Sequence, residues 1–279
     1  MKGYALVALS VVLVASAACD HLVRPSDPLE ADPDVATVGI VLIAGEEVAR
    51  MLAAHPHRPR NGSPPTLDAV LKGPGWMAAF SEALPLDSCT LASPDRWPGP
   101  TTCLQAALSE PIRPRVRYGI AGTTATGEFT GTVLVPAPPE LLEPGDTLAL
   151  PPPSGARRVE VAVRYRIEPD VGTVRVEIPD ASETSDDGTE VKVDLGLLGV
   201  IPATLEGTGT DTLSVRYRGK PMRFSLQLLA LGWNHTNFLA HTGSFPLPEP
   251  WPNFGIEGKG AYGYFAAAAP SRAAEIQVR

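Results

Sequence analysis

The sequence predicts an all-β protein built from two β-sandwich-like modules. Glycine (26 residues) and proline (30 residues) make up about a fifth of the 279 residues, a composition that favours many turns between short elements. Beyond residue 36, short apolar runs alternate with clusters of turn-forming residues. These connections read as turns rather than as crossover helices, which disfavours a parallel βαβ arrangement. The chain length fits one large domain or two small ones.

Residues 1–18 have the features of a secretory signal peptide. Lys2 supplies a positive charge, and the apolar run that follows is about fifteen residues long, too short to span a bilayer comfortably. The run ends with Ser-Ala-Ala directly before Cys19, which resembles the lipobox of bacterial lipoproteins. The resemblance implies that Cys19 becomes the mature N-terminus and carries acyl chains that hold the protein on a bilayer. Ser16 stands where the lipobox usually has leucine, so a soluble product cut before Cys19 and an uncleaved signal anchor are the alternatives.

Residues 19–35 predict an extended, solvated tether. Five acidic side chains and three prolines lie within them, a composition that does not build a core. Clustered carboxylates could bind Ca²⁺, but glycine and a bidentate glutamate are missing at the spacing of a calcium loop. We therefore interpret the segment as a linker.

Residues 36–136 predict an N-terminal β-sandwich. Its seven expected strands span residues 37–44, 48–54, 66–71, 76–81, 104–109, 116–121 and 129–135. Residues 46–54 are rich in Glu, Ala, Leu and Met and could instead form a two-turn helix. We favour a hairpin there.

Cys89 and Cys103 predict a disulfide. They lie fourteen positions apart in a chain whose signal directs it to an oxidising compartment. Closing a loop of that size contributes about 3 kcal/mol in the chain-entropy model. A reactive thiol pair is the alternative, and the absence of a Cys-x-x-Cys spacing disfavours it.

A proline-rich passage at 137–156 predicts the linker to a second β-rich domain, 157–279. The strands expected there span residues 159–167, 173–178, 191–195, 201–206, 212–218 and 223–230. An Asp-Asp-Gly sequence at 186–188 predicts a hairpin turn. One short helix is expected around 237–239, with Trp233 and Phe238 packed inward.

The C-terminal passage 253–265 carries a family resemblance. It reads Asn-Phe-Gly-Ile-Glu-Gly-Lys-Gly-Ala-Tyr-Gly-Tyr-Phe and follows a Tyr-Gly-Ile-Ala-Gly pattern at 118–122. The order of these features resembles a family of bacterial envelope lipoproteins, common in Bacteroidota, that is known only as a domain of unknown function. The end motif of that family reads roughly Asn-Ile-x-Gly-Gly-x-Gly-x-Phe, and two residues are inserted here after Asn253. The resemblance implies an N-terminal immunoglobulin- or transthyretin-like sandwich, a second β-rich domain and anchoring at the envelope. It implies no activity, substrate or catalytic residue.

The glycines of this passage also fit the Gly-x-Gly-x-x-Gly pattern of phosphate-binding loops. That fingerprint requires a strand before it and a helix after it, whereas prolines precede Gly258 and an alternating strand follows Gly263. We therefore predict a structural role, in which Gly258, Gly260 and Gly263 allow positive φ or a close backbone approach.

The remaining residues predict no catalytic, metal or cofactor site. The net charge of −8 leaves no basic surface for nucleic acid, which we exclude as a partner. The Gly-x-Ser-x-Gly pattern of hydrolases does not occur in the sequence. His55 and His57 would share one face of a strand, but two ligands do not make a metal site.

Trp97 and Trp251 are the candidate ligand contacts, because one lies in the disulfide loop and the other between prolines. The leading hypothesis is a non-enzymatic, membrane-anchored envelope lipoprotein that binds a protein or a glycan outside the cytoplasm. A secreted hydrolase with a site assembled only in three dimensions, and a structural spacer, are the alternatives.

Overall fold

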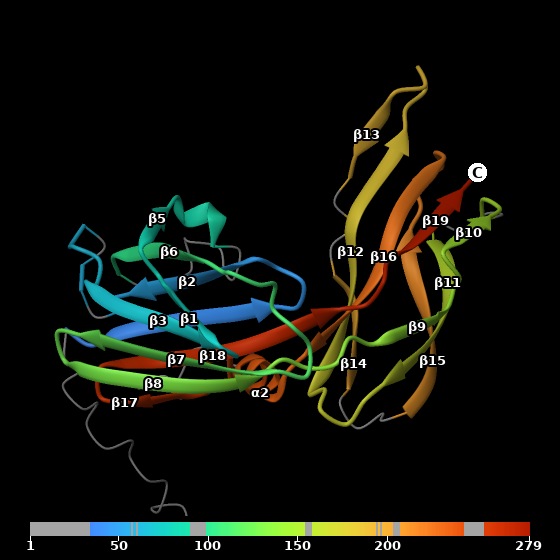
Figure 1. Ribbon diagram of the computed structural model, residues 1–279. Coiled ribbons are helices and arrows are strands. Elements are labelled where there is room, and N and C mark those ends of the chain that lie inside the picture. Colours follow the sequence, from blue (N-terminus) through green and yellow to red (C-terminus); the bar gives the residue numbers. More distant parts are fainter. Residues whose placement is uncertain are drawn as a thin grey trace, which may run out of the picture. The chain divides into compact units, whose positions relative to one another are not determined.

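Nearly all regular structure in the protein is β-strand (Figure 1), which confirms the predicted all-β class. The computed structural model describes residues 34–56, 58–59, 61–89, 99–153, 158–193, 195, 197–202, 207–242 and 254–279. These residues form nineteen strands, one α-helix and one short 3-10 helix.

The N-terminal half is a sandwich of two sheets. One sheet has the strand order β17 (Ile256–Gly258), β8 (Gly127–Leu134), β7 (Arg117–Thr124), β3 (Leu67–Gly73) and β4 (Trp76–Ala79). The facing layer has the order β18 (Ala261–Pro270), β1 (Ala36–Ile43), β2 (Val48–Ala54), β6 (Thr101–Ala107) and β5 (Glu82–Leu84). Ile40 and Met51 from this layer pack with Ile120 and Phe129 from the other sheet in one buried core. Residues 48–54 form the strand of the favoured hairpin rather than a helix.

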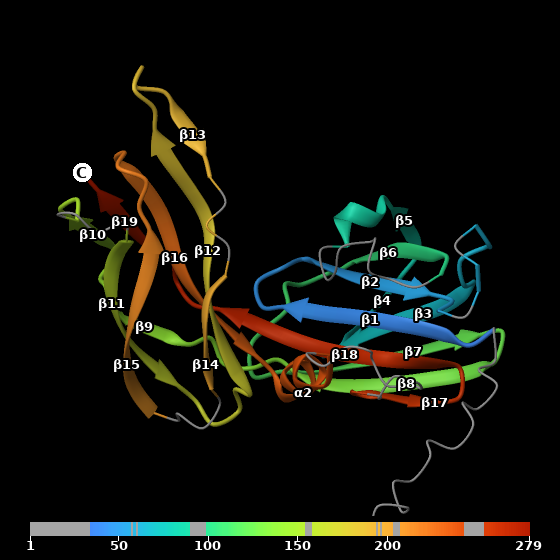
Figure 2. The same ribbon diagram turned by 180° about the vertical axis from the view of Figure 1, so that it is seen from behind.

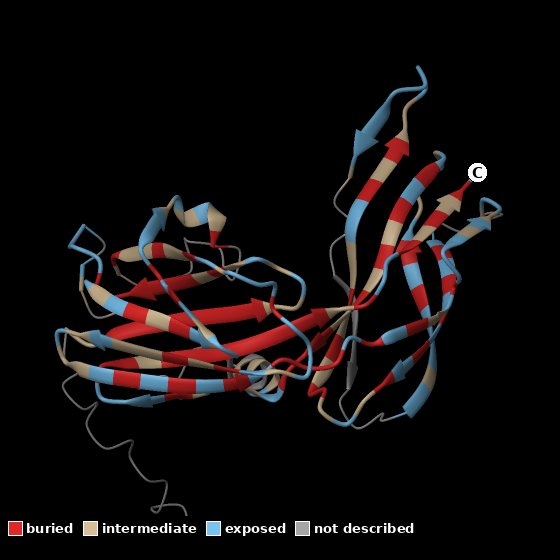
Figure 3. Ribbon diagram, viewed as in Figure 1, coloured by how far each residue is buried: buried red, intermediate tan, exposed pale blue. Residues whose placement is uncertain are grey.

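β1 and β18 are the centre of this half and are buried on both faces. They pair in parallel over eight residues, from Ala36 opposite Ala261 to Ile43 opposite Ala268. One face joins the core between the sheets, and the other is covered by a second cluster that includes the cysteines and Phe238. Burial on both faces explains why these strands read as continuous apolar runs instead of alternating (Figure 3).

The C-terminal half is also built from two layers. β15 (Gly207–Arg216), β11 (Arg158–Ile167) and β9 (Glu140–Glu143) form one sheet. The other layer contains β14 (Leu197–Pro202), β12 (Thr173–Thr184), β16 (Met222–Leu231), β19 (Ala274–Val278) and β10 (Thr147–Leu150), with β13 (Glu190–Lys192) paired to the end of β12. β11 alternates strictly between buried and exposed residues, which matches the predicted period of two. Gly188 adopts a positive φ in the turn between β12 and β13, as expected of an Asp-Gly hairpin.

The strand pairing differs from the predicted division of the chain. The segment predicted as a linker, 137–156, contributes β9 to the sheet of β11 and β10 to the strand β19. β17 and β18, predicted within the second domain, pair with β8 and β1 of the N-terminal sandwich. β18 also pairs with β16, so hydrogen bonds join the two halves in one sheet (Figures 1 and 2). Proline content marks turns, but it does not reveal which distant strands pair across them.

Helix α2 (Trp233–Thr242) is longer than the single turn expected at 237–239. Phe238 points inward as predicted, and its ring stacks on that of Tyr264 with centroids 4.0 Å apart. Trp233 was expected to be buried, but 51% of its surface is exposed. It is the first residue of the helix.

The disulfide between Cys89 and Cys103 is confirmed. It joins the end of the 3-10 helix η2 (Leu86–Ser88) to β6, and both cysteines are buried. In the part of the chain that the structure describes, no helix has the length and apolarity needed to cross a bilayer.

The structural role predicted for the C-terminal glycines is also confirmed. Gly258 and Gly263 adopt φ values of 117° and 128°. A Cβ at Gly260 would lie 2.2 Å from the Gly127 carbonyl oxygen, and one at Gly263 would lie 1.9 Å from that of Val38. Side chains at these positions would therefore prevent β18 from lying against β1 and β8.

Candidate functional site

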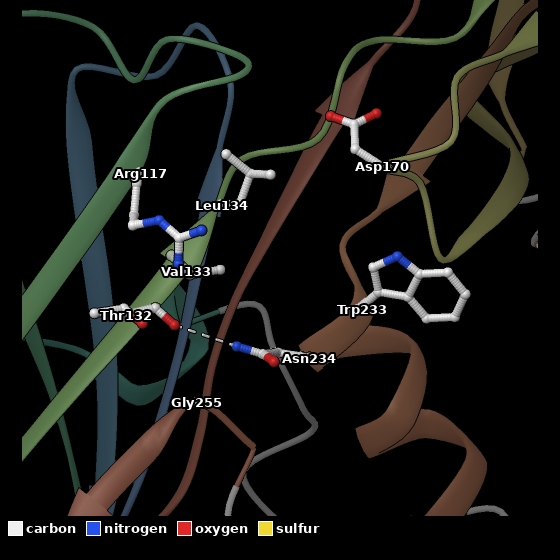
Figure 4. A pocket seen from close by; sticks show the side chains of 8 residues that line it. All are labelled: Arg117, Thr132, Val133, Leu134, Asp170, Trp233, Asn234 and Gly255. Carbon is white, nitrogen blue, oxygen red and sulfur yellow. Dashed lines mark hydrogen bonds between the residues drawn. The ribbon is translucent and has the colours of Figure 1, made fainter.

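A cleft of about 490 Å³ lies where β7, β8 and the start of α2 meet the turn that joins β11 to β12 (Figure 4). The described residues that line it are Arg117, Thr132, Val133, Leu134, Asp170, Trp233, Asn234 and Gly255. Its volume falls within the range of about 300–1,000 Å³ that is typical of small-molecule sites.

One wall carries a positive charge beside an apolar side chain. Arg117 and Leu134 are directly opposite each other on the antiparallel strands β7 and β8, so their side chains lie on the same face. Leu134 is 37% exposed. Arg117 is exposed and forms no salt bridge with any described carboxylate, although most described arginines do. Within the described ranges, this wall therefore offers the cleft a guanidinium group that has no ion-pair partner.

The opposite wall carries Asp170, which the β11–β12 turn holds in place. Its Oδ2 accepts a hydrogen bond from the Ala137 backbone N–H at 3.1 Å. The turn itself is fixed by the Gly172 N–H, which donates to the Leu231 carbonyl at 2.8 Å. The other carboxylate oxygen, Oδ1, is buried and has no hydrogen-bond donor among the described residues. Asp170 therefore has one unfilled acceptor.

The first turn of α2 forms the third side of the cleft. β17 pairs with β8 only as far as Gly131, and beyond that residue the edge of β8 has no strand partner among the described residues. Asn234 covers this edge, because its Nδ2 donates to the carbonyl oxygens of Thr132 at 3.4 Å and Phe265 at 2.9 Å. The preceding residue, Trp233, also lines the cleft, and its indole extends away from the strands that carry Arg117 and Thr132 (Figure 4).

A half-buried histidine, His235, follows these two residues in the helix. Burial lowers the pKa of His235 to about 4, and the positive charge of Arg175 lowers it further in the same direction. The imidazole is therefore neutral at physiological pH. Its Nδ1 is buried and has no hydrogen-bond partner among the described residues, and His235 does not line the cleft.

Of the candidate site residues that the sequence predicts, His55, Cys89 and Cys103 are described, and they do not line this cleft. Cys19, His57, Trp97 and Trp251 lie outside the described residues. His55 is buried, and its Nδ1 lies 3.3 Å from the Val35 carbonyl oxygen. The described residues contain no group of three or more His, Cys, Asp or Glu side chains that could hold a metal ion.

Sequence reasoning missed Arg117, Asp170 and Asn234 as site residues. Arg117 reads as the polar position of an alternating strand, and Asp170 and Asn234 read as ordinary turn and helix residues. Trp233 was noted, but as a core residue. One feature of the sequence could have indicated that Trp233 is exposed. Trp233 directly follows Gly232 and is the first residue of the helix.

No family model and no curated protein matches the chain. Solved structures with similarity include the N-terminal Ig1-2 module of the Drosophila receptor protein tyrosine phosphatase DLAR, at 12% identity over 88% of this chain and 99% of that one, with a TM-score of 0.32. The titin domains z1z2 in complex with telethonin show 16% identity over 89% of this chain and 98% of that one, with a TM-score of 0.20. A mutant of the CFA/I adhesin CfaE of enterotoxigenic E. coli shows 8% identity over 89% and 84%, with a TM-score of 0.26. At these scores the similarity adds nothing to what the sheet topology establishes.

Proposed function

We propose that the protein is a lipid-anchored envelope protein whose body is a non-enzymatic binding module, and that the cleft between Arg117, Asp170 and Trp233 holds its ligand. The observation that carries the proposal is the convergence in one cleft of Arg117, which has no salt bridge to a described carboxylate, with the carboxylate of Asp170 and an exposed indole. A ligand in the cleft would contact all three groups, and at Asp170 it would contact Oδ2, because Oδ1 is buried.

The distribution of exposed apolar side chains supports this choice of site. Four large apolar side chains are exposed among the described residues: Met77, Leu134, Val191 and Trp233. Two of them, Leu134 and Trp233, line the same cleft. Exposed apolar groups that gather beside polar ones are typical of binding surfaces, and tryptophan and arginine are the residues that most often dominate binding energy.

The composition of the cleft favours binding over catalysis. Its described lining has one hydroxyl side chain, Thr132, and no histidine, cysteine or lysine that could activate it as a nucleophile. Asp170 is the one carboxylate there, whereas glycoside hydrolysis ordinarily uses two. The hydrolase alternative therefore gains no support from the described residues of the cleft.

Retention on an array of envelope glycans and peptides tests the binding module. We expect the wild-type protein to be retained by at least one class of ligand and Trp233→Ala to lose that retention. Val191→Ala is the matched control, because it removes an exposed apolar side chain that does not line the cleft. Both variants should keep the wild-type Tm, since neither position is buried. Retention that survives Trp233→Ala would overturn the assignment of the cleft.

Labelling with a palmitate analogue tests the anchor, which rests on the small residues directly before Cys19. We expect the label to be incorporated into the wild-type protein and to be lost in Cys19→Ala, with the protein then released from membranes without detergent. Labelling that persists in Cys19→Ala, or a purified protein that retains its first eighteen residues, would refute lipidation.

A further inference from the structure

We propose that the ligand of the cleft is an acidic sugar, a pyranose ring that carries a carboxylate. Its carboxylate would bind Arg117, its C–H face would lie on Trp233, and its hydroxyl groups would donate to Oδ2 of Asp170, because Oδ1 is buried. This inference rests on the proposed function and adds the chemical class of the ligand.

The two charges of the cleft indicate that the ligand has an anionic group and binds in one orientation. The guanidinium of Arg117 is planar and donates to a carboxylate through two parallel N–H groups. Arg117 and Asp170 come from opposite walls (Figure 4), so a ligand carboxylate at Arg117 is kept away from the like charge of Asp170. A ligand with an anionic group at one end and hydroxyl donors at the other can therefore bind both Arg117 and Asp170.

The indole of Trp233 favours a sugar over other anionic ligands with hydroxyl groups. Trp233 is 51% exposed and lies on the same side of the cleft as Asp170 (Figure 4). A pyranose presents an apolar face of C–H groups and a rim of hydroxyl groups, so that stacking on the indole brings the rim toward a neighbouring acceptor. An entirely apolar ligand would cover Arg117 and Asp170 without giving either a partner, which is unfavourable.

The edge of β8 argues against an extended peptide as the ligand. A peptide that added a strand here would need the backbone groups of Thr132 and Leu134. The Thr132 carbonyl already accepts a hydrogen bond from Asn234. Gly232 lies close to the Leu134 carbonyl, because a Cβ at Gly232 would be 3.4 Å from that oxygen. Strand addition would therefore have to displace the start of α2.

Titration calorimetry with two matched oligosaccharides tests the inference. The probes are a hexuronic acid oligomer and its carboxyl-reduced form, which keeps the same rings and linkages and loses only the charge. We expect the wild-type protein to bind the acidic oligomer at least about tenfold more tightly than the reduced one, and higher salt to weaken only the acidic oligomer. Arg117→Gln should remove this preference, and Trp233→Ala should weaken the binding of both oligomers.

Arg216→Gln is the matched control. Arg216 is likewise an exposed strand arginine without a salt bridge to a described carboxylate, and it does not line the cleft. It should leave both affinities unchanged. Equal affinity for the two oligomers, or a preference that survives Arg117→Gln, would overturn the acidic-sugar assignment. If neither oligomer binds but another class of ligand is retained through Trp233, the acidic-sugar assignment fails and the proposed function stands. If nothing is retained through Trp233, the proposed function fails with it.

Discussion

Acidification between pH 6.5 and pH 4 should destabilise the protein through one side chain, His235. Burial, with a smaller contribution from the charge of Arg175, lowers its folded-state pKa to about 4. In the unfolded chain an ordinary histidine titrates near a pKa of about 6.5. Between these values the unfolded state binds a proton that the folded state does not bind, so the free energy of unfolding must fall as the pH falls.

The size of the effect follows from the two pKa values. Linkage gives a loss of about 2 kcal/mol at pH 5 and about 3 kcal/mol at pH 4 relative to pH 7. A loss of that size is a large fraction of the stability of an ordinary domain, which is about 5–15 kcal/mol. Other groups also titrate in this range, so the contribution of His235 has to be measured against a variant without the imidazole.

Urea denaturation of the wild type and of His235→Gln, at several pH values between 7 and 4, measures the contribution of His235 to the free energy of unfolding. The amide does not titrate, so the difference in free energy of unfolding between the two proteins should shift by about 3 kcal/mol in favour of the variant as the pH falls to 4. In Arg175→Met the pKa of His235 should rise only part of the way, because burial is the larger cause. Parallel pH profiles for wild type and His235→Gln, or an imidazole that titrates near pH 6.5 by NMR in the folded protein, would refute this reasoning.

Three further predictions concern stability, each measured by urea denaturation at pH 7. Replacing Cys89 and Cys103 with serine should lower the free energy of unfolding by about 3 kcal/mol, and reduction of the wild type should reproduce that loss; equal stability with and without the disulfide would contradict it. Phe265→Ala should lower the free energy of unfolding by about 3–5 kcal/mol, because the ring is fully buried. Met77→Ala, at a position that is 72% exposed, should change it by no more than about 0.5 kcal/mol. Similar values for the two variants would argue against the assigned core. Gly263→Ala should lower the free energy of unfolding by about 3 kcal/mol or more. The new Cβ would lie 1.9 Å from the Val38 carbonyl oxygen, and the residue has a φ of 128°. An unchanged stability would show that β18 does not lie against β1 as described.

Local features of the fold could be predicted because they depend on neighbouring residues. The period of two in β11, the Asp-Gly turn and the spacing of the two cysteines each reflect physics within a short stretch of chain. The return of β18 to pair in parallel with β1 could not be predicted in this way, since more than 200 positions separate partners such as Val38 and Gly263. The glycine at 263 did indicate a close backbone approach, but not the strand that it approaches.

The cleft was harder to predict than the fold because no motif encodes it. Its charged residues come from different parts of the chain, with Arg117 on a strand of one sandwich and Asp170 on a turn of the other. Trp233 was expected to pack inward with Phe238 beside the helical turn predicted at 237–239. Its exposure follows from a packing constraint that appears only in three dimensions: Asn234 must turn toward the uncovered edge of β8, and its neighbour is then directed outward. The edge that β17 leaves open therefore has two consequences. It requires a polar cap at the start of α2, and the residue next to that cap, Trp233, lines a cleft with two charges that form no salt bridge among the described residues.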